Sequence, residues 1–194
     1  MKYGLSILSV MILSFSTMAQ DKKTFKKENF FTGGNITASF FTGGIVLGAN
    51  PHFGYSITSW LDAAISLNYN YTGQTDQYSY KYRQHVISPG AFVRIFPIES
   101  IFLQGQLEHN FLKLKVTAPN GSPENFNAQT NSFLVGAGYA SGRQSGNNNF
   151  FYFSVMYDLF QQPNSPYVDS YDRAIPIVNA GFNIALFQGG DRKK

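Results

Sequence analysis

The chain has 194 residues, of which 43% are hydrophobic, 16% aromatic and 13% charged, and its formal net charge is +4. Soluble domains carry about 25% charged residues, so this composition is unusual for a protein whose whole surface faces water. The sequence contains no cysteine, which excludes disulfides, cysteine-ligated metals, thiol nucleophiles and a lipid anchor on cysteine.

The N-terminus has the pattern of a secretory signal peptide, which we predict over residues 1–19. A positive start precedes the apolar run 5–15, and Ala19 supplies a small residue before the cleavage site. The run is shorter than the roughly 20 residues of a membrane-spanning helix. Residues 20–32 then form a basic leader and residues 188–194 a basic tail, both predicted to lie in the periplasm.

After the leader, eight segments alternate apolar and polar residues with the two-residue period of a β-strand. In chain order they cover residues 33–41, 45–57, 62–72, 82–96, 101–116, 130–140, 150–160 and 173–187. The alternation is plainest in 62–72, where the apolar parity ends in Tyr69 and Tyr71. In 101–116 the parity changes, so we expect either a β-bulge near Phe111 or a strand that has left the lipid there.

The connections between these segments differ in length. Short turns follow the second and fourth segments, whereas longer polar connections follow the third, fifth and seventh. The longer ones span residues 73–80, 118–128 and 161–172. Outer-membrane barrels have short periplasmic turns and long external loops, so we expect the longer connections outside, where they would contact any surface ligand.

The polar parity of the segments consists of Asn, Ser, Gly, Gln and Thr with few charges, which suits a narrow interior better than a water-facing surface. A soluble sandwich or lipocalin-like barrel, with its apolar face inside, is the competing interpretation. An even number of consecutive strands of bilayer-crossing length, in an exported chain, instead predicts an all-β fold. The predicted architecture is an eight-stranded antiparallel up-and-down transmembrane β-barrel, present as a monomer.

The sequence also resembles the small eight-stranded outer-membrane barrels of the OmpX and OmpA transmembrane-domain type, and most of all the outer membrane β-barrel domain proteins of Bacteroidota. The resemblance lies in HFGYSITSWLDAAISLNYNY, SPGAFVRIFPIESIFLQGQLEH and the closing GFNIALF, and it covers nearly all of the mature chain. It implies insertion into the cell outer membrane by the barrel-assembly machinery, and contact with outer-membrane lipid and lipopolysaccharide. Many such barrels end on an aromatic residue, whereas Phe187 is followed by seven further residues.

Four titratable residues fall on the inward parity: His52, Arg94, Glu108 and Asp158. A buried charge must be paired, and Arg94 with Glu108 is the expected pair between neighbouring strands. We interpret the four residues as an interior polar network that plugs the barrel, with a gated proton or ion path as the alternative. Eight strands leave an interior just wide enough for side chains, so no open pore is expected.

Four basic residues cluster toward the predicted external rim: Lys81, Arg83, Lys113 and Lys115. Lipopolysaccharide presents phosphates at this height, which makes these residues candidate lipopolysaccharide contacts. Ordinary solubility of the rim explains them equally well.

Two histidines, His85 and His109, fall on the outward parity and raise the possibility of a lipid A-modifying enzyme. No serine lies two residues from either histidine, and Glu108 has the wrong parity to assist them. The sequence contains no phosphate loop, no metal-spaced cluster and no nucleic-acid motif. We therefore expect no catalytic residue, no cofactor and no metal.

The expected function is that of an integral outer-membrane protein with a structural or surface-interaction role. A narrow channel or small-solute transporter is the first alternative, and a lipid A-modifying enzyme is the second.

Overall fold

The computed structural model describes residues 26–41, 43–143, 148–168 and 173–187. The predicted signal peptide and C-terminal tail lie outside these ranges, as do residues 20–25 of the predicted leader. A single-turn 3-10 helix, η2 (Lys27–Asn29), precedes the first strand. In the described ranges, no helix is long and apolar enough to cross a membrane.

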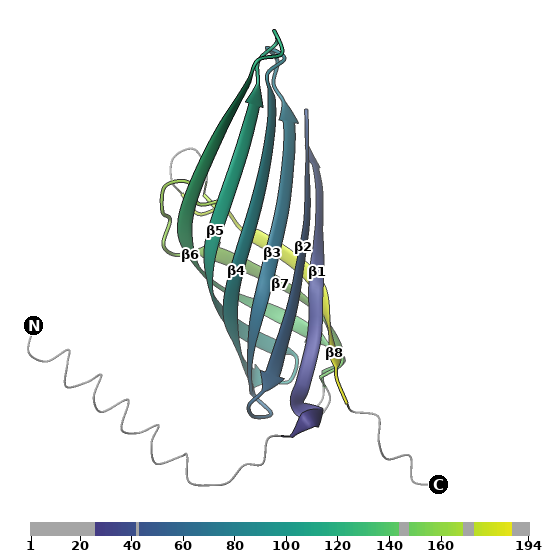
Figure 1. The fold of residues 1–194 in the computed structure, drawn as a ribbon. Coiled ribbons are helices and arrows are strands. Elements are labelled where there is room, and N and C mark those ends of the chain that lie inside the picture. The colour runs from purple at the N-terminus through teal and green to yellow at the C-terminus, as the bar shows by residue number, and fades with distance from the viewer. Residues whose placement is uncertain (1–25, 42, 144–147, 169–172, 188–194) are drawn as a thin grey trace, which may run out of the picture.

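Eight antiparallel strands close into one barrel, in which each strand pairs with its neighbours in the chain and the last pairs with the first (Figure 1). The strands are β1 (Phe30–Phe41), β2 (Gly44–Ser56), β3 (Leu61–Thr75), β4 (Lys81–Ile98), β5 (Ile101–Thr117), β6 (Pro123–Ser141), β7 (Phe150–Asp158) and β8 (Ile177–Ala185). The prediction of an all-β, eight-stranded, up-and-down antiparallel barrel is confirmed. The first strand begins at Phe30 rather than at residue 33.

The apolar parity of the strands faces out and the polar parity faces in, as predicted. On the outward side, Leu67, Val93 and Phe182 are 50%, 43% and 44% exposed. On the inward side, Asn68, Arg94 and Asn183 are 8%, 2% and 2% exposed. A soluble sandwich or lipocalin-like barrel has its apolar face inside, which is the opposite arrangement, so the soluble-barrel interpretation is excluded.

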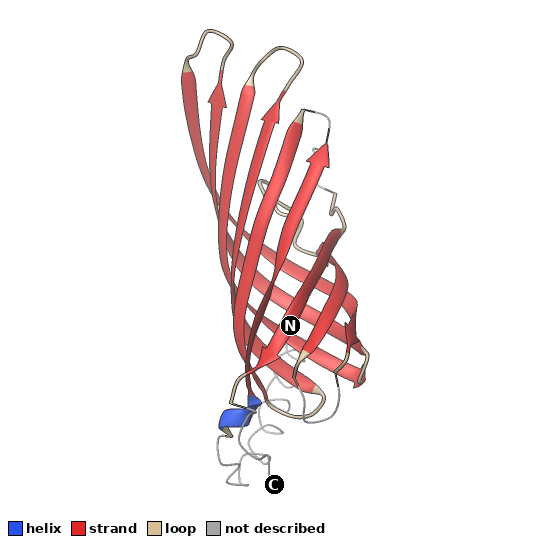
Figure 2. Ribbon diagram, turned by 90° about the vertical axis from the view of Figure 1, so that its right-hand side faces the viewer, coloured by secondary structure: helices blue, strands red, loops and turns tan. Residues whose placement is uncertain are grey.

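The wall of the barrel is higher on one side than on the other. β6 pairs with β7 only from Leu134 to Ser141, so residues 123–133 rise beyond β7. β1 likewise pairs with β8 only from Phe31 to Asn35. Figures 1 and 2 show the longer strands extending well past the short β7 and β8 at this end of the molecule.

Two predictions for this tall wall were wrong. The β5–β6 register runs without interruption through Phe111, so no bulge forms there. Leu112 is buried and Lys113 is exposed, so the alternation of inward and outward side chains continues past Phe111. The parity seemed to change in the sequence because the outward residues at this height are polar. The alternative, that the strand has left the lipid there, stays a prediction. The predicted loop 118–128 is also shorter, since β6 begins at Pro123.

The barrel interior has layers of different character. Aromatic residues fill the end that carries the short turns: Phe96, Phe102, Phe150 and Tyr152 with Ala140, and beside them Phe31, Phe92 and Ala64. Polar side chains fill the middle, and a small apolar group made of Leu134, Met156 and Tyr167 lies among them, with Leu134 opposite Gln106. The polar network therefore borders the aromatic layer on one side.

Glycines make room for the aromatic layer, which gives a test of the packing. A Cβ added to Gly138 would overlap the Phe102 ring and lie 2.6 Å from the Phe153 carbonyl oxygen. Gly138→Val should therefore lower the free energy of unfolding by about 1–3 kcal/mol, measured as a lower urea midpoint. Gly105→Ala is the matched control, because the nearest atom to a Cβ at that outward position is a Phe133 ring carbon at 3.8 Å. Equal midpoints for the two variants would contradict the packing.

Candidate functional site

The four titratable residues predicted for the interior all lie on the buried face. The exposed fractions of His52, Arg94, Glu108 and Asp158 are 5%, 2%, 3% and 0%. They do not meet at one point, and each has its own set of partners. The site is therefore a network that extends along the barrel rather than a single cluster.

Arg94 and Glu108 do not form the direct pair expected from the sequence. In the β4–β5 register, Arg94 lies opposite Gln104, whereas Glu108 lies opposite Gly90. Two glutamines of β5 connect the charges instead. Arg94 Nε donates to Gln104 Oε1 at 2.6 Å. Gln104 Nε2 then donates to Gln106 Oε1 at 2.7 Å, and Gln106 Nε2 donates to Glu108 Oε1 at 2.6 Å. All three donors run from the cation toward the anion, so the hydrogen bonds polarise one another favourably.

The guanidinium of Arg94 is also enclosed by aromatic rings. Its central carbon lies 4.5 Å from the ring centre of Phe92, 5.0 Å from that of Phe102 and 4.4 Å from that of Tyr152. A desolvated cation–π contact stabilises by about 2 kcal/mol. Asn183 Oδ1 accepts a further, longer hydrogen bond from Arg94 at 3.4 Å. The charge is thus held by rings and amides in place of a neighbouring carboxylate.

The connection between β7 and β8 enters the upper mouth of the barrel, and we call its residues 159–168 the plug. The Tyr167 hydroxyl donates to Glu108 Oε2 at 2.7 Å and accepts from Asn68 Nδ2 at 2.7 Å. Burial and the neighbouring Glu108 carboxylate raise the pKa of Tyr167 well above its ordinary value, so the hydroxyl stays protonated and donates. Ser165 Oγ donates to Asp158 Oδ2 at 2.7 Å. The plug thereby closes the upper end of the network.

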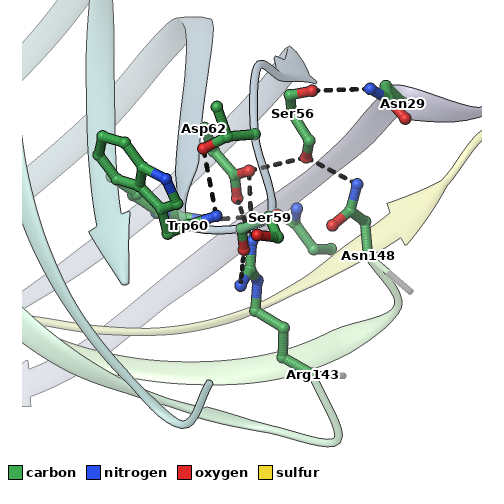
Figure 3. A network of polar contacts seen from close by, with 10 residues as sticks. Asn29, Ser56, Ser59, Trp60, Asp62, Arg143 and Asn148 are labelled. Carbon is green, nitrogen blue, oxygen red and sulfur yellow. Dashed lines mark hydrogen bonds and ion pairs between the residues drawn. The ribbon is translucent and has the colours of Figure 1, made fainter. Parts of the chain in front are cut away.

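A second buried cluster closes the lower end (Figure 3). Arg143, from the β6–β7 turn, forms an ion pair with Asp62 at 3.4 Å and donates to the Ser59 carbonyl at 2.9 Å. Asp62 also accepts a hydrogen bond from Ser56 Oγ at 2.7 Å. The guanidinium carbon lies 3.4 Å from the ring centre of Phe96. The cation therefore ties the turn to β3 and covers the aromatic layer.

The side chains of the network leave little free space. The cavity that they line in the barrel interior has a volume of about 30 Å³. This is room for one or two water molecules and too little for a hydrated ion. The described interior is consequently filled from the plug to the Arg143 cluster.

The four basic residues predicted for the rim lie together on the outward face of the tall wall, Lys81 and Arg83 on β4 and Lys113 and Lys115 on β5. We call them the basic patch. Arg83 lies opposite Lys115, and His85 lies opposite Lys113. Except for Lys81, these residues line a groove of about 780 Å³ with Phe111 and the amides of β6. No acidic residue is among the described residues lining this groove, so the surface attracts anions.

The outward histidines have partners that do not suit hydrolysis. His85 Nδ1 lies 2.9 Å from the Tyr69 hydroxyl, and His109 Nδ1 lies 2.7 Å from Asn131 Oδ1. A phenol and an amide do not make the nucleophile, base and acid of a hydrolase. In the part of the chain that the structure describes, no three acidic or histidine side chains are placed to hold a metal ion.

Sequence reasoning missed the two residues that close the ends, Tyr167 and Arg143. Tyr167 was assigned to an external loop and Arg143 to a turn. The available signal for Arg143 was a lone cation in a turn at the same end of the barrel as Asp62. For Tyr167 there was no local signal, because its partner Glu108 is 59 residues away in the chain.

No family model matches this chain, and no curated protein matches it. A structural match was found to Ail, the attachment invasion locus protein of Yersinia pestis, in complex with the heparin analogue sucrose octasulfate. The two chains share 14% sequence identity with a TM-score of 0.49, and the match covers 80% of this chain and 94% of that chain. The description of the fold therefore rests on the strand topology of this chain itself.

The Arg143 cluster gives a test of the closed lower end. Arg143→Met leaves the buried Asp62 carboxylate without its cation, so the free energy of unfolding should fall by about 3–5 kcal/mol in urea titrations. Adding Asp62→Asn to this variant should restore part of the loss. Lys115→Met removes an exposed cation instead and should change stability by about 0.5 kcal/mol or less. A loss for Arg143→Met no larger than for Lys115→Met would contradict the closed end.

Proposed function

We propose that this chain is an integral outer-membrane β-barrel that is inserted by the barrel-assembly machinery after export. The observation that supports this most strongly is the apolar band around the outside of a closed barrel with a polar interior. On β4 the band runs from Ile87 to Ile95, both exposed. At ~3.3 Å per residue and ~40° of tilt, these eight steps cover about 20 Å, most of the ~25 Å lipid-facing band of such barrels. Closure leaves no unpaired edge inside that band.

We also propose that the tall end faces the outside and the opposite end faces the periplasm. η2 and the end of β8 lie at the lower end in Figure 1. The connections 57–60 and 99–100 lie at this end and are short, whereas the long β7–β8 connection lies at the other. Short periplasmic turns and long external connections are the rule for these barrels. The external connections, including 76–80 and 118–122, would then meet any surface ligand.

The role that we propose is structural or surface-interacting, without solute conduction and without catalysis. The closed ends and the filled interior argue against the channel alternative. The partners of His85 and His109 argue against a lipid A-modifying enzyme. No observation favours either alternative over the proposed role.

At the tall end, we propose that the basic patch contacts lipopolysaccharide phosphates. Tyr71 of β3 lies opposite His85 of β4, and Arg83 lies two residues nearer the tall end of β4 than His85. Tyrosines mark the level of the membrane interface, so the cations just beyond them lie at the level of lipid phosphates. Each such cation contributes about 1 kcal/mol of attraction to an anionic surface.

Fractionation tests the proposed location. Expressed with its own N-terminal segment in a Gram-negative host, the chain should be recovered with the outer membrane. On SDS gels the unheated protein should migrate faster than the boiled protein, because a closed barrel resists SDS.

Val93→Arg places a charge in the apolar band and should lower the free energy of unfolding by about 2–4 kcal/mol. Recovery of wild type as a detergent-free soluble species would refute the proposal.

Planar bilayers test the absence of conduction. The purified wild-type barrel should give no steady unit currents, because side chains fill its interior from the plug to Arg143. A large porin reconstituted in the same way serves as the positive control. Reproducible unit currents from wild type, abolished by the heat that unfolds the barrel, would instead favour the channel.

A further inference from the structure

The outward face of β6 carries a row of amide side chains, Asn125, Asn127, Gln129 and Asn131, all of them exposed. In the register, this amide row faces Lys115, Lys113, Phe111 and His109 of β5 in the same order. Amides supply both donors and acceptors, while lysines supply charge-assisted donors. The groove of about 780 Å³ along these residues is therefore suited to sugar hydroxyls and phosphates together.

The last pair of the row, His109 with Asn131, lies where a lipid-facing surface should be apolar. Two residues nearer the tall end than His109, Phe111 of β5 lies opposite Ile87 of β4, and both are exposed and apolar. The His109 and Asn131 side chains are hydrogen-bonded at 2.7 Å, with the Phe111 ring edge-on to His109 at 4.6 Å between ring centres. With His109 Nδ1 as the donor, His109 Nε2 accepts and the Asn131 amide nitrogen donates further bonds. Such a pair in lipid costs free energy unless a lipid hydroxyl and carbonyl bond to it.

Directly below this pair, the outer wall is hollowed. Leu107 lies opposite Ala91 on one side and Phe133 on the other. With Gly105 they line an apolar groove of about 690 Å³. Gly105 opens the floor, because the nearest atom to an added Cβ is a Phe133 ring carbon at 3.8 Å. An acyl chain fits a groove of this character on a lipid-facing wall.

These three features lie in line along β5 and match the thickness of one leaflet. Lys113 and Gly105 are eight residues apart in the sequence. This separation is about 26 Å along the strand at ~3.3 Å per residue, and about 20 Å along the membrane normal at ~40° of tilt. One leaflet with its headgroups is about 20–22 Å thick.

We infer that this face binds one phosphorylated glycolipid of the outer leaflet, whose acyl chain carries a hydroxyl near its carbonyl. Its phosphates meet Lys113 and Lys115, and its sugar hydroxyls meet the outer three amides, Asn125, Asn127 and Gln129. The hydroxyl and carbonyl at the base of one chain bond to His109 and Asn131, and that chain fills the groove over Gly105. The inference rests on the proposed outer-membrane location and on the proposed phosphate contacts of the basic patch, and it adds the residues that hold the sugar, the hydroxylated base of one acyl chain and the chain itself.

The test uses the processed full chain in phosphatidylcholine nanodiscs, with purified lipopolysaccharide and its fully deacylated phosphosugar as the two probes. Lys113→Ser with Lys115→Ser should weaken binding of both probes by about 30-fold. His109→Leu with Asn131→Leu should weaken only the intact lipid, by about fivefold to tenfold. Gly105→Leu should also weaken only the intact lipid, by about fivefold. Ala180→Leu, an outward position on β8, is the matched control and should change neither.

Heat-dependent gel migration of each variant separates loss of binding from loss of insertion. Leucines suit the apolar band, so the His109 and Asn131 variant should migrate as wild type does. If that variant and Gly105→Leu insert and bind intact lipid as wild type does, the inference is overturned while the proposed location stands. Equal affinity for the two probes also overturns it. Failure of wild type to insert in the outer membrane overturns both.

Discussion

The closure of β1 on β8 is the contact on which the whole barrel depends, because it removes the two open edges of the sheet. This seam is short, since β1 pairs with β8 only from Phe31 to Asn35. Interior side chains reinforce it from within. The His52 side chain of β2 is hydrogen-bonded to Asn183 of β8 at 2.8 Å. The Asn35 amide of β1 donates to the Tyr152 hydroxyl of β7 at 3.3 Å. The polar filling therefore does more than occupy space: it links strands on both sides of the seam.

The interior also shows how opposite charges can be accommodated without touching. A direct pairing of Arg94 with Glu108 would require the β4–β5 register to shift by four residues, because Arg94 lies opposite Gln104 and Glu108 lies opposite Gly90. The glutamines of β5 bridge the charges without such a shift, and their own donors and acceptors are used in doing so. Tyr167 of the plug bonds to Glu108, which ends the hydrogen-bonded chain from Arg94. The position of the plug in the mouth and the arrangement of this chain therefore depend on each other.

Parity along a single strand was enough to predict which side chains lie inside, because each strand alternates independently of the rest. Leu67 and Arg94 are on the predicted sides for this reason. The same rule failed where the outward side chains of the strands are polar. Residues 123–128 carry asparagines at the outward positions 125 and 127 and were read as part of a loop. The apparent parity change in 101–116 also placed Leu112 outward. The contacts of Tyr167 and Arg143 depend on how connections fold back over the barrel ends, which no local pattern encodes.

The barrel is not alike all the way round. β7 and β8 have 9 residues each, whereas β4, β5 and β6 have 18, 17 and 19. The basic patch and the amide row both lie on the long strands. Seen along the barrel axis, the protein therefore has a tall front and a low back. In the proposed membrane orientation, neighbouring molecules that approach from the back meet a low rim, while those at the front meet the raised basic patch, so lateral crowding around this protein is directional.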